Sequence, residues 1–288
     1  SANPDLVKAR GFLHELYPHP SLRGATLLHL VAGYPQRARL PDNVLDLGQL
    51  LIDRGADVQA LSADSTSVIN LIVKSAQLRW RKQQIEAVDL IIAEGIGNDP
   101  RLMWHTMVPP LQREVPSPIH LQLAQRFYEG GATVDLPFAA ALGLVEEMPV
   151  FFDEAGKLHP EANVLYRPRA TKVSDQELLD QALLYAVYGG QAETATFLLD
   201  RGAAIDGRPN GGFWETFAGV TPMHIGVWAD RPEMVIFLLE RGANPTIADK
   251  NFGAPPVAWA THLNRETCRV HLLAAMQEWQ VKASTPTE

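Results

Sequence analysis

The chain ends an amphipathic stretch with nearly the same corner three times, at residues 50–57 ("LLIDRGAD"), 197–204 ("FLLDRGAA") and 237–244 ("FLLERGAN"). In each corner, apolar residues precede an acid, an arginine, a glycine and a small residue. Glycine commonly ends a helix because it adopts the left-handed backbone conformation without a steric penalty. A corner repeated in this way predicts a repeated helical unit, whose core forms between neighbouring units.

The clearest unit runs over residues 221–245, "TPMHIGVWADRPEMVIFLLERGANP". Thr221 suits the N-cap of a first helix, and Pro222 suits its first turn. Residues 230–232 ("DRP") end that helix, and a second helix continues to the corner at Gly242. Apolar residues at helical spacing in both segments predict a pair of short antiparallel helices followed by a loop.

This unit resembles an ankyrin repeat, whose signature is T-P-L-H at the first helix and L-L-x-x-G-A-D after the second. The matching residues are Thr221, Pro222, Met223, His224, Leu238, Leu239, Gly242, Ala243 and Asn244. Residues 24–29 ("GATLLH") and 50–58 form an earlier copy. The resemblance implies an all-α fold, an ankyrin-repeat solenoid of stacked antiparallel helix pairs with projecting loops. It also implies that His29 and His224 are structural and hydrogen-bond the backbone of a neighbouring loop.

We expect one ankyrin-repeat domain over residues 1–280 and a disordered tail at 281–288. The predicted parts are a capping helix at 5–23, repeats one to four at 24–156, an irregular connecting strap at 157–177 and repeats five to seven at 178–276. The fourth repeat is a degenerate helix pair. Connections longer than the family pattern occur at 33–43, 74–84 and 106–118. A long link such as the strap is uncommon inside a compact array, so it is a candidate for a functional segment.

The composition argues against several classes of protein. A formal net charge of −8 over 288 residues disfavours nucleic acid as the main partner. The single cysteine, Cys268, rules out an intramolecular disulfide. The sequence contains no regular metal-ligand spacing, phosphate loop or dinucleotide motif, so we expect no metal and no cofactor.

We expect neither a membrane-spanning segment nor a catalytic centre. No apolar run approaches the ~18 residues that a spanning helix needs. A cytoplasmic location is the expectation, and a removed export signal is the alternative because the chain begins at Ser1. The histidines are scattered, and no nucleophile with a matching base is recognisable, so no catalytic residues are predicted.

Aromatic residues gather in the C-terminal half. In the ankyrin pattern, the residue after the motif histidine and the residue three positions further on face the concave groove. In the last three repeats these positions include Tyr185, Tyr188, Trp228, Trp259 and His262. We give equal weight to two interpretations: the rings bind a partner, since Tyr and Trp are enriched at binding hot spots, or they pack against neighbouring helices.

The loop at 207–220 ("GRPNGGFWETFAGV") is longer than the family spacing requires and contains Phe213, Trp214 and Phe217. Such a loop either folds back over the array or reaches a partner. We favour partner contact, because exposed aromatic clusters are unusual on a monomer.

A basic cluster in the 74–84 connection consists of Lys74, Arg79, Trp80, Arg81 and Lys82. A solvated turn is the favoured interpretation. The alternative is a patch for an anionic partner, either an acidic protein segment or a phosphate-bearing ligand.

Taken together, these features predict a non-catalytic scaffold for protein–protein interaction. We expect it to bind another protein through its concave groove and loop fingers, mainly in the C-terminal half, and to be a monomer. The first alternative is a small-ligand-binding protein or an enzyme that uses the segments at 157–177 and 207–220 as a lid. The second alternative is a homo-oligomer in which the aromatic face meets its own copy.

Overall fold

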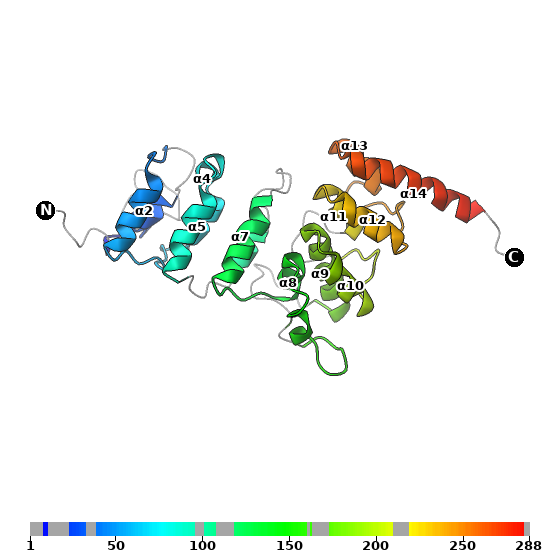
Figure 1. Cartoon of the computed structure of the whole chain (residues 1–288), viewed down its shortest axis with the longest axis horizontal. Helices are drawn as coiled ribbons and strands as arrows, with labels where there is room; N and C mark the ends of the chain where they lie inside the picture. The colour runs from blue at the N-terminus through cyan, green and yellow to red at the C-terminus, as the bar shows by residue number, and fades with distance from the viewer. Residues whose placement is uncertain are drawn as a thin grey trace. The chain divides into compact units, whose positions relative to one another are not determined.

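Short helices arranged in successive pairs make up most of the described chain, as the repeated corner predicts (Figure 1). The structure is a computed structural model, which describes residues 8–10, 23–32, 39–95, 101–107, 118–159, 162, 173–209 and 219–284. Among these residues, strand pairing is limited to two isolated bridges. The chain divides into two compact units: Ser1–Pro110 with Gln122–Thr133, and Leu111–Leu121 with Val134–Glu288.

The described part of the first unit holds three successive pairs of helices and one extra short helix, α4 (Ala76–Trp80). Most of the last helix, α7 (Pro118–Glu129), belongs to this unit. The pairs are α1 (Leu27–Val31) with α2 (Val44–Asp53), α3 (Val68–Lys74) with α5 (Gln84–Ala93), and α6 (Arg101–Met107) with α7 (Pro118–Glu129). Helix α3 packs against α1 and α6, and α2 packs against α5. An ion pair of 3.7 Å between Arg126 and Asp89 joins α7 to α5. Successive pairs therefore share one apolar interior.

The second unit continues the same arrangement. Its helices are α8 (Leu136–Leu142), α9 (Asp175–Gly189), α10 (Ala192–Asp200), α11 (Pro222–Trp228), α12 (Pro232–Glu240), α13 (Pro256–His262) and α14 (Glu266–Ser284). The first helices pack in series, α8 on α9, α9 on α11 and α11 on α13, and each of α9, α11 and α13 packs on its own second helix. The fold class predicted from the sequence is confirmed.

Three predicted boundaries differ from the structure. The fourth repeat has no second α-helix in the described residues; η4, a short 3-10 helix at Met148–Phe151 with Pro149 in its first turn, takes that place. Helix α9 begins at Asp175 with Ser174 as its cap, so it starts inside the predicted strap at 157–177. Helix α14 reaches Ser284, four residues into the predicted tail at 281–288. Gln, Glu, Lys and Ala are good helix formers, and the polar composition of this end did not signal a stop.

Most of the predicted capping helix and most of the predicted strap lie outside the described residues. The capping helix at 5–23 is described only at residues 8–10 and 23, and the strap is described at 157–159, 162 and 173–177. These two parts of the domain prediction stay predictions.

The repeated corner is a left-handed helix end. The φ angles of Gly55, Gly202 and Gly242 are +81°, +93° and +85°. The N–H of the following alanine donates to a carbonyl five residues back, as Ala243 does to Leu238 at 3.0 Å. Ala56, Ala203 and Ala243 are all buried, at 8%, 7% and 1% exposure. This burial explains why a small apolar residue follows each glycine.

The two motif histidines make the same buried contacts. The backbone N–H of Thr26 donates to Nδ1 of His29 at 3.2 Å, and Nε2 of His29 lies 3.1 Å from the carbonyl oxygen of Thr66. In the later repeat, Thr221 donates to Nδ1 of His224 at 3.2 Å, and Nε2 lies 3.0 Å from the carbonyl oxygen of Ala254. Because Nδ1 accepts, Nε2 must carry the proton and donate. The predicted structural role is confirmed.

Two carboxylates hold the corners of the second unit: Asp180 joins helix α9 to the corner at Ala204, and Asp206 joins that corner's loop to the corner at Asn244. Oδ1 of Asp180 accepts from the N–H of Ala204 at 2.8 Å, and Oδ1 of Asp206 accepts from the N–H of Asn244 at 3.0 Å. Burial raises the pKa of both carboxyls, although these hydrogen bonds oppose the shift. Neither acid belongs to the repeat motif, so the sequence did not indicate its role.

We predict that Gly242→Ala lowers the free energy of unfolding by about 1 kcal/mol. The cost is conformational, because an added Cβ at Gly242 meets no atom within 4 Å. Urea denaturation measures the change. Gly242→Asn should cost less, since Asn tolerates the left-handed region better than Ala. Gly189→Ala should cost more than either, because its Cβ would collide with the carbonyl oxygen of Ala141. Equal stability of all variants would contradict the role of the corner.

We predict that acid weakens the fold through His224. Burial lowers the pKa of this imidazole below its ordinary value, so the unfolded chain binds a proton more readily than the folded chain. The histidine's contribution to stability is therefore intact above about pH 6.5 and is lost as the pH falls below it. His224→Gln should flatten the pH dependence of the unfolding free energy in this range.

The matched control for this measurement is His262→Gln, which removes an exposed imidazole. It shows how much of any change follows from removing an imidazole at the surface. An unchanged slope in His224→Gln would show that the buried imidazole does not couple to folding.

Candidate functional site

Four aromatic rings that the ankyrin pattern assigns to the groove are buried. The exposed fractions of Tyr185, Tyr188, Trp228 and Trp259 are 4%, 2%, 7% and 8%. They lie on α9, α11 and α13, the first helices of three successive repeats. This burial corresponds to the second of the two interpretations, in which the rings pack against neighbouring helices.

The buried rings contact other rings from element to element. Tyr185 meets Phe138 of α8 edge-on, with the centroids 5.6 Å apart, and Tyr188 lies 6.0 Å from Trp228. Trp259 meets the imidazole of His224 at 5.2 Å. Burial also raises the pKa of Tyr188 to about 12, so the phenol is neutral near pH 7. These rings stabilise the stack of first helices, and a partner has little access to them.

His262 and Phe252 are the exposed members of this region. His262 follows Trp259 by one turn on α13, so the two side chains share a side of the helix. Phe252 lies in the loop before α13 and is 72% exposed, although its ring lies 6.4 Å from that of Trp259. Phe252 was not identified from the sequence, because the ankyrin positions used for the prediction lie on the first helices and Phe252 lies in a loop.

Asp249 holds the loop that presents Phe252. Oδ1 of Asp249 accepts from the N–H groups of Asn251 at 2.8 Å and Phe252 at 2.6 Å. Oδ2 accepts from the N–H of Ala254 at 3.2 Å and from the indole of Trp259 at 3.0 Å. Burial alone would raise the pKa of Asp249, but the hydrogen bonds outweigh it and lower the pKa. The exposed ring therefore projects from an ordered base.

The base of the predicted aromatic finger lies beside this loop. Phe213, Trp214 and Phe217 lie outside the described residues, but both ends of the finger are described. The N–H of Gly219 donates to the carbonyl oxygen of Pro209 at 3.2 Å, which closes the base. A Cβ added at Gly219 would come within 2.8 Å of Cβ of Lys250, so the finger and the Phe252 loop start from neighbouring positions.

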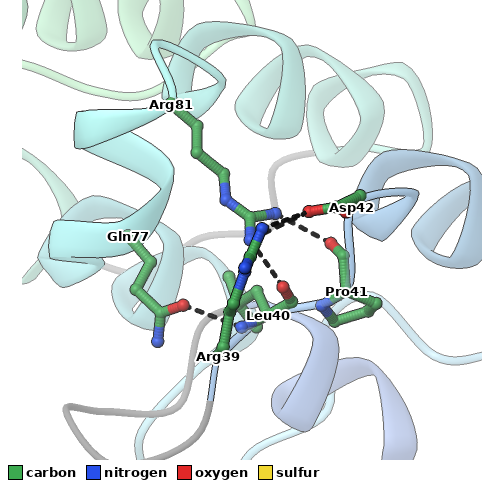
Figure 2. A network of polar contacts seen from close by, with 6 residues as sticks. All are labelled: Arg39, Leu40, Pro41, Asp42, Gln77 and Arg81. Carbon is green, nitrogen blue, oxygen red and sulfur yellow. Dashed lines mark hydrogen bonds and ion pairs between the residues drawn. The ribbon is translucent and has the colours of Figure 1, made fainter.

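The basic cluster lies in the first unit at an extra short helix, α4 (Ala76–Trp80). Lys74 ends α3, Arg79 and Trp80 end α4, and Arg81 and Lys82 form the turn that follows. Trp80 is 82% exposed. Arg81 is turned away from solvent toward the segment before α2 (Figure 2). The structure thus separates this cluster into an exposed part and a part that holds the local fold.

The remaining candidates give no catalytic arrangement. Burial raises the pKa of the Cys268 thiol to about 11, which leaves little of the reactive thiolate. In the described ranges, no group of three or more His, Cys, Asp or Glu side chains is placed to hold a metal ion. A cavity between the first two helix pairs is lined only by apolar residues, among them Leu28, Val44, Val68, Ile72 and Ile91.

In the parts of the chain that the structure describes, no helix combines the length and the apolar character required to cross a membrane.

Comparisons with known proteins locate the family signal in the second unit. A family model described as "Ankyrin repeats (3 copies)" matches residues 159–249. Among solved structures, the chain is similar to the ankyrin repeat domain of Bcl-3, described as a unique member of the IkappaB protein family. The identity is 18% over 88% of this chain and 87% of that chain, with a TM-score of 0.34. No curated protein matches the chain.

We predict that Asp249→Ala loosens the Phe252 loop. The change removes the acceptor of three loop N–H groups and of the Trp259 indole N–H. The free energy of unfolding should fall by about 1–3 kcal/mol, because buried donors are left without a partner. Hydrogen exchange at the amides of Asn251, Phe252 and Ala254 should accelerate, which nuclear magnetic resonance measures. Asp53→Ala is the control, because that exposed carboxylate accepts a hydrogen bond from the side chain of Gln49 in its own helix. Unchanged protection in Asp249→Ala would contradict the anchoring role.

Proposed function

Because the chain is an ankyrin-repeat protein, a type of protein-interaction module, we propose that it is a non-catalytic scaffold that binds another protein mainly through its C-terminal half. The contact surface in this proposal consists of Phe252, His262 and the finger residues Phe213, Trp214 and Phe217. Of the buried rings, that of Trp259 lies next to this surface, 6.4 Å from the ring of Phe252.

The observation that carries the proposal is the exposed ring of Phe252 on an anchored loop. A large apolar side chain stabilises a complex by leaving water, and a fixed loop loses little conformational freedom when it binds. Asp249 provides that fixation in the free protein.

The neighbouring finger strengthens the argument. Gly219 at its base lies against Lys250 of the Phe252 loop. The described ends of the finger, Pro209 and Gly219, therefore lie beside the loop that carries Phe252. The finger's sequence contains three aromatic residues, a type that is enriched at interface centres.

The alternative, a small-ligand site or an enzyme with the segments at 157–177 and 207–220 as a lid, has less support. It requires polar or titratable groups around a pocket beneath those segments. The cavity found in the first unit is apolar, and most of both segments lies outside the described residues. The lid stays a prediction without an observation that favours it.

We predict that Phe252→Ala weakens partner binding about thirtyfold, which corresponds to a hot-spot loss of ~2 kcal/mol. The test recovers the partner from the cells that produce the protein, identifies it, and measures the affinity of the purified pair by calorimetry. Trp214→Ala should weaken binding as well.

The matched control is Val270→Ala on α14, where the side chain is 52% exposed on a different helix. It should bind as the wild type does. If Phe252→Ala and Trp214→Ala both bind with wild-type affinity, the C-terminal loops are not the contact surface. A measured monomer in sedimentation removes the homo-oligomer alternative.

A further inference from the structure

The first two helix pairs surround a small cavity of about 30 Å³ in the first unit. It lies between α1, α2, α3 and α5, and Leu78 of α4 also lines it. No residue that lines the cavity has a polar side chain. A water molecule needs about 10–15 Å³ of space, but it also needs roughly three polar partners. The cavity is therefore large enough for water and too apolar to hold it.

Gly48 of α2 contributes to this space because it brings no side chain to the lining. A Cβ added at Gly48 would lie 3.8 Å from Cγ1 of Val31 and 3.9 Å from Cδ1 of Leu90, both ordinary contact distances. A methyl group would therefore fit between these two lining residues without strain. Glycine inside a helix is less stable than alanine, so the stability of α2 itself does not require it.

Buried hydrogen bonds hold the surrounding helices in place. Nε2 of His29 on α1 lies 3.1 Å from a carbonyl oxygen of the loop before α3. Nε2 of Gln84, at the start of α5, donates to the carbonyl oxygen of Val73 in α3 at 2.9 Å. The segment before α2 is held by Arg81, which donates to the carbonyl oxygen of Pro41 at 2.8 Å (Figure 2). Because a shift of these helices would disturb such bonds, the cavity does not close by simple collapse.

The size and position of the cavity suit a very small ligand. Val31, Leu45 and Leu90 line it and are half-buried, so the cavity lies just beneath the surface and a ligand has a short way in. An engineered apolar cavity of ~150 Å³ takes up benzene or xenon. A cavity of about 30 Å³, roughly a fifth of that size, matches a molecule of one or two heavy atoms.

We propose that this space, called the Gly48 cavity, is a binding site for a small uncharged apolar molecule of the size of xenon or methane. The occupant gains dispersion contacts with the lining side chains and leaves water, where its solvation is unfavourable. The site differs from the alternative of a ligand pocket beneath a lid, because it lies in the first unit and has no polar side chain in its lining. It does not depend on the C-terminal surface.

The test uses xenon as the probe and follows the methyl signals of the full chain by nuclear magnetic resonance under increasing xenon pressure. The methyl groups of Leu28, Val68 and Ile72, which line the cavity, should shift along a saturating curve. Gly48→Ala places a methyl group in the space, so it should weaken xenon binding at least fivefold. This variant should stay folded, because alanine is the better helix former.

The matched control is Gly242→Ala, which adds the same methyl group at a corner of the second unit where it meets no atom within 4 Å. It should bind xenon as the wild type does. The proposal is overturned if the wild-type shifts grow without saturation or if Gly48→Ala binds xenon as tightly as the wild type. Magnetisation transfer from water to the lining methyl groups would also overturn it, because water would then already fill the cavity.

Discussion

The spacing of the repeats depends on the hydrogen bonds of two buried, neutral histidines, His29 and His224. Each imidazole accepts a hydrogen bond at the start of its own helix and donates one to the loop that leads to the next first helix. The carbonyl that accepts from His29 belongs to Thr66, directly before Ser67, the cap of α3. The carbonyl that accepts from His224 belongs to Ala254, directly before Pro255, the cap of α13. One side chain thus sets the distance between two successive helices, and it does so only while uncharged.

Other contacts replace the histidine where the motif is missing. Helix α9 has no T-P-L-H sequence, and its position is fixed by close approach and by carboxylates. Gly189 lies so near the carbonyl oxygen of Ala141 that no side chain would fit between them. The hydroxyl of Thr194 donates to the carbonyl oxygen of Ala140 at 3.1 Å, and Asp180 holds Ala204 of the next corner. The same packing geometry therefore tolerates several sets of hydrogen bonds, which is why degenerate repeats still stack.

The sequence was sufficient for the parts of the fold that local chemistry determines. Glycine corners and the T-P-M-H motif depend on a few adjacent residues, so Gly242 and His224 were identified with their roles. The exposure of a ring depends on which distant segment covers it, and sequence position alone does not report that. From the sequence, Tyr188 and Trp228 could therefore face the groove or pack in the core. The structure shows that neighbouring helices bury both rings. Phe252 was missed for the same reason, because its exposure follows from the Asp249 bonds that turn its loop outward.

Stability and recognition use different residues in this chain because the repeat separates them physically. The first helices must face each other across a few ångströms, so their large rings are enclosed, as the contact between His224 and Trp259 shows. Loops and connections can leave some large side chains exposed while others fix the backbone. Phe252 and Trp80 project from such segments, at 72% and 82% exposure, and polar side chains at their bases hold the backbone in place. A partner that binds these rings would not have to disturb the stack, because the hydrogen bonds that position each loop lie behind the ring.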